Sequence, residues 1–149
     1  MRRLLNPGKG VEHSWAYLPD LAQAIAALLY RPERLRPFER VQFEGFWDAD
    51  GRGMAEAIRR ATGNSDNPER GFPWPLMRAL APFGGFPREV AEIEAYWRHP
   101  VRFDNQRLQS LIGEEPRTPI DEAVTRSLLS LGCLQNQERS DTSLRESAL

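Results

Sequence analysis

Apolar residues recur at helical spacing in several stretches of this chain, and the clearest of them follows Asp20. The apolar positions there are Leu21, Ala24, Ile25, Leu28 and Leu29. This i, i+3, i+4, i+7, i+8 pattern predicts an amphipathic helix with one buried face, and Pro32 should stop it. Asp20 is expected to cap the first turn of this helix, with Gln23 completing a capping box.

A second well-signalled helix begins at Thr118 and Pro119. Thr118 is expected at the N-cap and Pro119 at the first helical position. Acidic residues follow in the first turn, where the helix dipole favours negative charge. The predicted buried stripe consists of Ile120, Val124, Leu128 and Leu131, and Gly132 ends the helix.

Shorter elements are predicted between and around these two helices. Helices are expected at residues 54–62, 75–81, 89–98 and 104–111. Alternation of apolar and polar residues predicts strands at 11–17 and 39–47, with a short edge strand at 101–103. Residues 1–10 and 64–70 are rich in turn-forming or polar residues and are expected to be loops.

This order of elements indicates an α/β fold that is mostly helical (α+β) and has a single core. The core is expected within residues 1–134. Residues 135–149 are polar and carry no core pattern, so they are predicted to be a disordered tail.

Composition excludes several classes of protein. The net charge of −1 gives no reason to expect a nucleic acid or an anionic membrane surface as a partner. Cys133 is the only cysteine, which excludes a disulfide framework and makes the cytoplasm the expected location. No run approaches 18 consecutive apolar residues, so no segment is predicted to span a membrane.

Gly51-Arg-Gly53 is the one glycine arrangement that resembles a phosphate-binding loop, because it lies between a predicted strand and a predicted helix. The position of the third glycine holds Glu56, whose carboxylate would oppose a pyrophosphate. The preceding strand is half polar, unlike the buried first strand of a dinucleotide-binding fold. We therefore interpret this segment as an ordinary strand–loop–helix connection.

Other catalytic arrangements are weakly indicated. His13, His99 and Cys133 do not have the spacing of metal ligands. Spacing alone leaves a Ser-His-Asp triad open, although the sequence contains no G-x-S-x-G motif. Asp48 and Asp50 flank a loop and are expected to be solvated turn residues.

Aromatic residues are more informative, because they occur in predicted loops as well as in helices and strands. Trp15 and Tyr17 lie on the first strand, and Phe72 and Trp74 alternate with prolines. Such residues are typical of the wall of a ligand pocket that carries few polar groups. The alternative is a satellite hydrophobic cluster beneath a long loop.

Residues 13–22 lead from a strand into a helix and end in Asp20-Leu-Ala22, with Trp15 and Tyr17 at aromatic positions. This stretch resembles the late strand–helix junction of the NAD-dependent epimerase/dehydratase family, the extended short-chain dehydrogenase/reductases. The pattern of that family is roughly R-D-Y-I-H-V-x-D-L-A. His13 stands where many sugar-nucleotide members carry arginine, which argues against a UDP-sugar substrate.

Residues 101–124 resemble the closing signature of the same family. That signature is a short strand, D-x-[ST]-[KR], LG, a proline and a final helix. The matching parts here are Val101 to Leu108, Leu111 to Gly113, Pro116, and Thr118 to Val124. Gln106 departs from the pattern, which has a small hydroxyl residue at this position.

The resemblance implies a Rossmann domain joined to a smaller, mostly helical substrate domain. Residues 1–134 would be the C-terminal substrate-binding part, with an incomplete parallel sheet. The glycine-rich NAD(P) loop and the catalytic Tyr-x-x-x-Lys pair of the family are absent from this sequence. We therefore expect a truncated homologue, a fragment or a chain with a mis-assigned start that is inactive alone, contains no catalytic residue and binds no cofactor by itself. The candidates for substrate binding are His13, Trp15, Tyr17, Phe72 and Trp74.

The full-length family acts on a small-molecule substrate with NAD(P) as cofactor. In the part represented here, the incomplete sheet would leave an edge open to self-association. Two alternatives stay open: a non-catalytic binding or regulatory module of the same ancestry, and an unrelated small enzyme.

Overall fold

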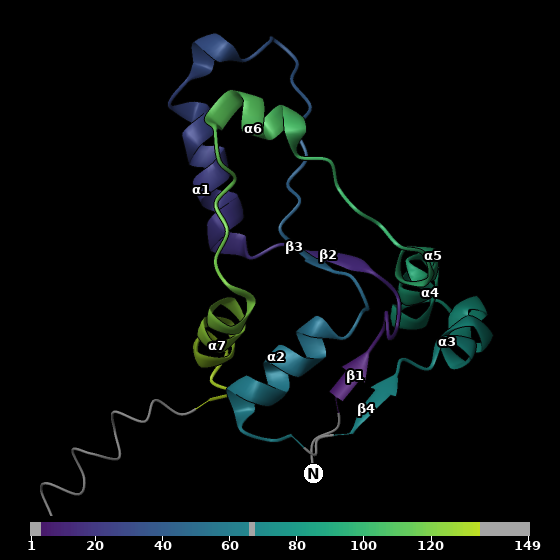
Figure 1. Ribbon diagram of the computed structural model, residues 1–149. Helices are drawn as coiled ribbons and strands as arrows, with labels where there is room; N and C mark the ends of the chain where they lie inside the picture. The colour runs from purple at the N-terminus through teal and green to yellow at the C-terminus, as the bar shows by residue number, and fades with distance from the viewer. Residues whose placement is uncertain (1–3, 66–67, 135–149) are drawn as a thin grey trace, which may run out of the picture.

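The computed structural model describes residues 4–65 and 68–134 (Figure 1). It is a mixed α/β structure, and its helices and strands follow in chain order as β1 (Leu4–Asn6), β2 (His13–Trp15), α1 (Leu18–Leu29), β3 (Phe46–Asp48), α2 (Gly53–Thr62), β4 (Glu69–Gly71), α3 (Trp74–Leu80), α4 (Phe86–Glu92), α5 (Glu94–Arg98), α6 (Gln106–Ile112) and α7 (Ile120–Ser130). Two 3₁₀ turns, Pro32–Arg34 and Ala81–Phe83, follow α1 and α3. The predicted tail at 135–149 lies outside the described residues.

The strands form two separate two-stranded sheets near the middle of the molecule (Figure 1). β1 and β4 are parallel, and β2 and β3 are antiparallel. His13 lies opposite Asp48, and Trp15 lies opposite Phe46. His13 also forms a single parallel bridge with Val101, so the predicted edge strand is reduced to one residue. Among the described strands, β1 and β4 are therefore the one parallel pair.

The strand predicted at 39–47 is wrong over most of its length, because only Phe46–Asp48 pairs. The backbone N–H groups of Glu44 and Gly45 donate to the two carboxylate oxygens of Glu115, at 3.0 and 2.9 Å. The buried side chain of Glu115 thus accepts backbone N–H groups that a neighbouring strand would otherwise accept.

β1 and β4 occur where the sequence predicted loops. Their pairing is anchored by Asn6, whose buried amide donates to the Gly51 carbonyl at 3.1 Å and to Glu69 at 2.9 Å. The same side chain accepts the N–H of Gly8. Each strand has three residues, which is too short for an alternation pattern to be recognised.

Helix α1 begins at Leu18, two residues before the predicted start, and Pro19 lies in its first turn. Of its predicted buried face, Ala24 is buried, whereas Ile25 and Leu29 are 51% and 70% exposed. The helix packs against α6 at one end of the molecule (Figure 1). The predicted single buried face is therefore wrong for two of its five positions.

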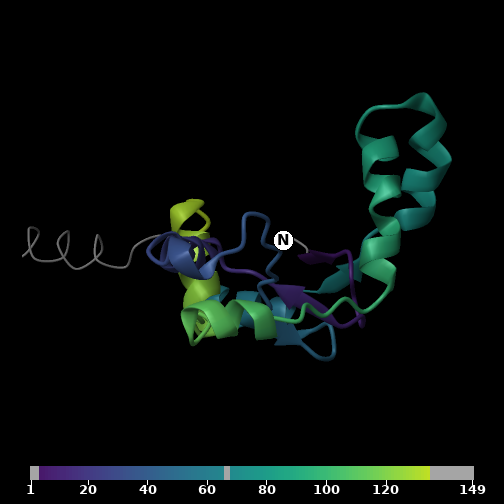
Figure 2. The same ribbon diagram turned by 90° about the horizontal axis from the view of Figure 1, so that it is seen from above.

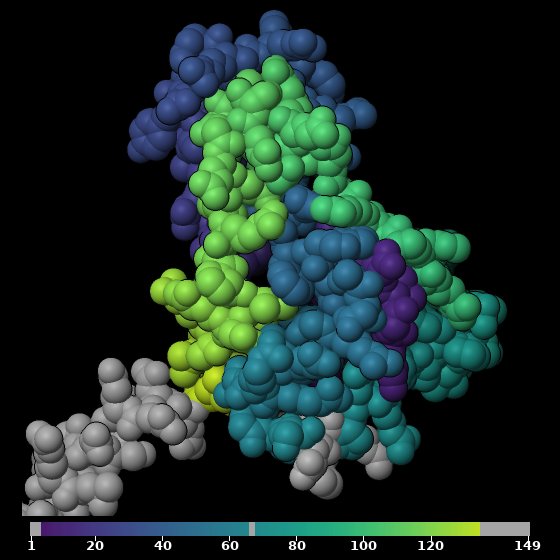
Figure 3. Space-filling model, in the orientation of Figure 1, coloured from purple at the N-terminus to yellow at the C-terminus, as the bar shows by residue number. Residues whose placement is uncertain are grey.

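Helices α2 and α7 pack against each other and lie side by side in the space-filling view (Figure 3). Ala57 of α2 and Val124 of α7 are buried at or near this contact. Gly63 ends α2 in the left-handed conformation at φ 61°, as predicted. Leu131, predicted in the buried stripe of α7, lies after the helix and is 74% exposed.

Helices α3, α4 and α5 form an arm that extends away from the rest of the molecule (Figure 2). The helix predicted at 89–98 is two helices, because the backbone leaves the helical path at Ile93. Glu94 begins the second helix and is buried, and its carboxylate pairs with Arg78 and Arg98. This ion-pair cluster joins α3 to α5.

Candidate functional site

The two stretches 13–22 and 101–124 are joined in space at both ends. At the first end, His13 of β2 bridges Val101. At the other, the Asp20 carboxylate accepts the backbone N–H and the hydroxyl of Thr118, both at 2.6 Å. Asp20 is 5% exposed, so these hydrogen bonds are shielded from water.

The predicted capping role of Asp20 is wrong. The N-cap position of α1 is Tyr17, and no side chain there caps the helix. Asp20 lies within the first turn and directs its carboxylate out of the helix to the residues before α7. Thr118 in turn is not the N-cap of α7, because Pro119 takes that position.

Glu115 is a second buried carboxylate that joins distant segments. It is 4% exposed and accepts the side-chain amide of Asn105 at 2.9 Å, in addition to the N–H groups of Glu44 and Gly45. Arg117 lies 3.7 Å away and balances its charge. The loop before β3, the start of α6 and the approach to α7 are thereby fixed relative to one another.

Asp48 is also buried, which corrects its prediction as a solvated turn residue. Its carboxylate accepts the N–H groups of Arg52, Gly53 and Met54 at the start of α2. Burial acts to raise the pKa of Asp48, but hydrogen bonds from Gly53 and Met54 outweigh it and lower the pKa below its ordinary value. The indole N–H of Trp15 also lowers the pKa of Asp48, although it is not placed well enough to form a hydrogen bond.

The cap that Asp48 forms on α2 determines whether the Gly51–Gly53 segment can bind a phosphate. The N–H groups that a phosphate would need at the start of α2 already donate to this carboxylate. Gly51 is packed against the backbone of Val11, where a side chain would collide. The segment is thus a capped strand–loop–helix connection, and its residues do not fit a dinucleotide phosphate.

His13, one of the predicted substrate contacts, is buried within an aromatic cluster whose other members are half-buried or exposed. Its ring stacks on Trp97, with centroids 5.0 Å apart, and meets the edge of Tyr96 at 5.7 Å. Trp15 completes the cluster, 5.8 Å from Trp97. His13 is 2% exposed and its Nδ1 lies 2.9 Å from the Val11 carbonyl. His13, which stands where many members of the resembled family carry arginine, is therefore a core residue.

Three buried polar atoms of β2 have no hydrogen-bond partner: His13 Nε2, Ser14 Oγ and Trp15 Nε1. Unpaired buried polar groups carry a desolvation cost and are uncommon in folded proteins. All three atoms belong to consecutive residues of one strand.

Phe72 and Trp74 form a separate pair, with ring centroids 4.7 Å apart. Trp74 is buried and its indole N–H donates to the Pro7 carbonyl at 3.1 Å. The next residue, Gly8, packs against His13. The structure thus places the Phe72–Trp74 pair and the cluster around His13 on either side of the Pro7–Gly8 turn. Of the five predicted residues, Trp15 and Tyr17 line an apolar cavity.

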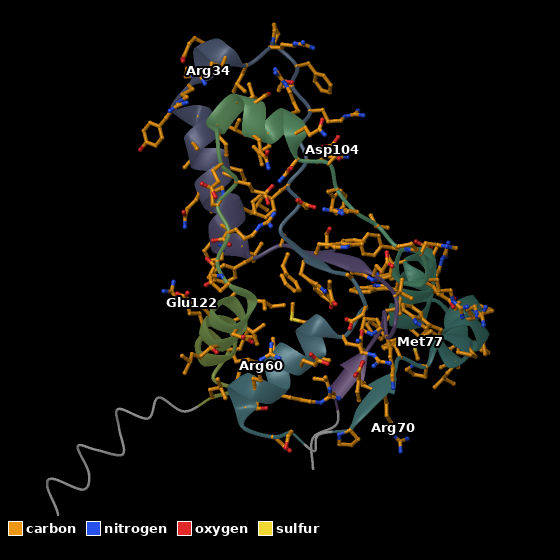
Figure 4. The ribbon with its side chains drawn as sticks, in the orientation of Figure 1. Arg34, Arg60, Arg70, Met77, Asp104 and Glu122 are labelled. Atoms are coloured by element: carbon orange, nitrogen blue, oxygen red, sulfur yellow. The ribbon has the colours of Figure 1, made fainter. Side chains whose placement is uncertain are left out.

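That cavity lies between the β2–β3 sheet and helices α2 and α7, and its volume is about 180 Å³. Side chains from these elements converge on the space between them (Figure 4). Most of its lining is apolar and includes Trp15, Phe46, Met54, Ile58, Ala123 and Val124. Asp20, Arg117, Thr118 and Ser127 contribute its polar lining.

Four polar side chains of this wall have partners, whereas the indole Nε1 of Trp15, which also lines the cavity, has none. Asp20 accepts from Thr118, and Arg117 pairs with Glu44 at 3.3 Å. The hydroxyl of Ser127 donates to the Ala123 carbonyl. General acid–base catalysis needs a titratable group in reach of the ligand. Of the titratable groups in this wall, Asp20 and Arg117 are engaged in the pairs above, and Tyr17 also lines the cavity. Within residues 4–65 and 68–134, no group of three or more His, Cys, Asp or Glu is placed to hold a metal ion.

Sequence reasoning missed Glu115, Asn105 and Trp97. Glu115 follows Gly113 and Glu114 in a short loop, where an acidic residue is normally solvated. Trp97 lies in the helix predicted at 89–98, but its contact with His13 joins residues far apart in the chain. No local signal reveals such partners.

Comparison with protein-family models, with curated proteins and with solved structures finds no match to this chain. Among the described residues, no helix has the length and apolar character needed to cross a membrane.

Proposed function

We propose that this chain is the C-terminal, substrate-domain portion of an NAD(P)-dependent epimerase/dehydratase-like oxidoreductase, and that it is inactive alone. The observation that carries the proposal is the meeting of the two stretches that resemble the family. They are separated by about 80 residues in the chain, yet they contact each other through His13–Val101 and through Asp20–Thr118. Two weak motifs that lie apart in sequence and join in space support a common origin better than either motif does alone.

In this proposal the chain supplies a wall of the substrate site, and the hydride chemistry comes from residues outside it. A dehydrogenase of this type needs a bound dinucleotide and a proton donor. The start of α2 does not fit a dinucleotide, because Asp48 occupies its N–H groups. None of the three tyrosines is followed by lysine four residues later. No catalytic step is therefore assigned to a residue of this chain.

The coding sequence on the 5′ side of this chain provides the test. An in-frame extension that encodes G-x-x-G-x-x-G and Tyr-x-x-x-Lys is expected, and the longer protein should bind NADH or NADPH. If the transcript encodes no such extension, the oxidoreductase assignment fails. The chain would then be better explained as a non-catalytic module of the same ancestry.

A further inference from the structure

Two small residues, Gly45 and Ala123, line the cavity between the β2–β3 sheet, α2 and α7. Gly45 lines it with φ 66°, a conformation that favours glycine, and a side chain there would collide with the Trp15 carbonyl. Ala123 lines it from α7 and is buried. The short side chain of Ala123 leaves space between larger apolar side chains on the facing elements, whereas Gly45 allows a close approach to the Trp15 backbone.

We propose that this cavity is a binding site for a small, neutral aromatic molecule. Its volume of about 180 Å³ is close to that of apolar protein cavities of about 150 Å³ that bind benzene. Trp15, Tyr17 and Phe46 provide aromatic surfaces against which a ring can stack or pack edge-on. A drug-sized molecule or a nucleotide requires a larger pocket.

The electrostatics of the wall favour a neutral ligand. The Asp20 carboxylate is satisfied by Thr118, and the Arg117 guanidinium is paired with Glu44 and Glu115. A charged ligand would have to break one of these pairs or remain without a counter-ion in an apolar space, which is costly. The cavity is only partly enclosed, so a ligand can enter without unfolding of α2 or α7.

The probe for the test is 5-fluoroindole, followed by fluorine NMR with the full chain. Saturable binding is expected, and Ala123→Leu should weaken it by about tenfold or more because the new side chain fills the cavity. Ala79→Leu is the matched control, since Ala79 lies exposed on α3. Absence of saturable binding, or equal binding by Ala123→Leu and the wild type, would overturn the proposal.

A second measurement does not depend on how a variant folds. With carbon-13 in the methionine methyl groups, the Met54 resonance should shift on addition of 5-fluoroindole, because Met54 lines the cavity. Met77, on α3 in the arm, serves as the internal reference (Figure 4). A shift of Met77 with no shift of Met54 would place the ligand elsewhere and refute the site. This inference is independent of cofactor binding, so either proposal can fail while the other stands.

Discussion

Buried carboxylates hold the loops of this protein in place, and each accepts hydrogen bonds from backbone N–H groups. Asp20 fixes the approach to α7, Asp48 caps α2, and Glu115 secures the loop before β3. An ionised carboxylate that accepts two or three N–H groups offsets much of its desolvation cost. The sequence shows the carboxylates but not these backbone donors, because the N–H groups that donate to Asp20 and Glu115 lie 70 or more positions away in the chain.

Glu39 is a surface carboxylate that also has its partner far away in the sequence. Its carboxylate accepts Nε and Nη2 of Arg107 on α6, at 3.0 and 2.6 Å. The hydrogen bonds from Arg107 lower the pKa of Glu39 from 4.5 to about 2, against the opposing effect of desolvation. Because the folded-state pKa is depressed, the pair stabilises the fold above the unfolded-state pKa of about 4.3, and this contribution is lost as the pH falls towards 2.

Titration of Glu39 by carbon-detected NMR should therefore give a midpoint near 2 in the wild type. Arg107→Gln removes the charged donor, so the midpoint should rise towards about 4.3, the ordinary value for glutamate, while the backbone N–H of Arg36 continues to lower it. Arg126→Gln is the matched control, because Arg126 pairs with Glu122 on α7. A wild-type midpoint near 4, unchanged by Arg107→Gln, would contradict the ion pair.

At the scale of elements, the helices could be predicted from sequence and the sheets could not. The sequence signals of a helix, which are helical spacing, helix-ending glycines and prolines, each extend over only a few residues. They predicted the bounds of α2, α3 and α7 to within about two residues. The strands are three residues long and are held by side chains such as Asn6 and Glu115. Alternation predicted a strand at 11–17, of which only His13–Trp15 forms β2, and it extended β3 over a loop that Glu115 supports.

The attachment of α1 to α7 depends on the hydrogen bonds between Asp20 and Thr118. Asp20→Asn should lower the free energy of unfolding by about 1.5–3 kcal/mol, because these are buried hydrogen bonds to a charged group. Thr118→Val removes only the hydroxyl donor, and the two substitutions together should show a coupling of about 1 kcal/mol. Denaturant unfolding of the two single variants and the double variant measures this coupling.

Gln23→Ala separates this role from helix capping. If Asp20 and Gln23 formed a capping box, Gln23→Ala would destabilise α1 about as much as the loss of a cap does, typically about 1 kcal/mol. Because Gln23 is exposed and α1 has no side-chain cap, the expected change is below about 0.5 kcal/mol. A large effect of Gln23→Ala with no coupling between Asp20 and Thr118 would restore the capping interpretation.

At the scale of the whole molecule, two surfaces are more apolar than is usual for a monomer. Asp20 is the only charged residue of α1 and is buried, while Leu18 and Leu29 are 73% and 70% exposed. The arm exposes Phe83 at 86%. A helix that is apolar on all sides is normally covered, and under the proposed function a dinucleotide-binding portion would cover α1.

The candidate site could be predicted only in part. Trp15 and Tyr17 line the cavity, as their place on the strand suggested. His13 instead belongs to the core, and Phe72 and Trp74 lie on the other side of the Pro7–Gly8 turn. An aromatic residue that packs in a core and one that lines a pocket carry the same local pattern, so only the three-dimensional contacts separate them.

Isothermal titration calorimetry of the purified 149-residue chain with NADH and with NADPH tests the central claim most directly. The account predicts no binding of either dinucleotide, because Asp48 occupies the N–H groups at the start of α2 and the chain has no Tyr-x-x-x-Lys pair. Micromolar binding of either one by this chain alone would contradict the account.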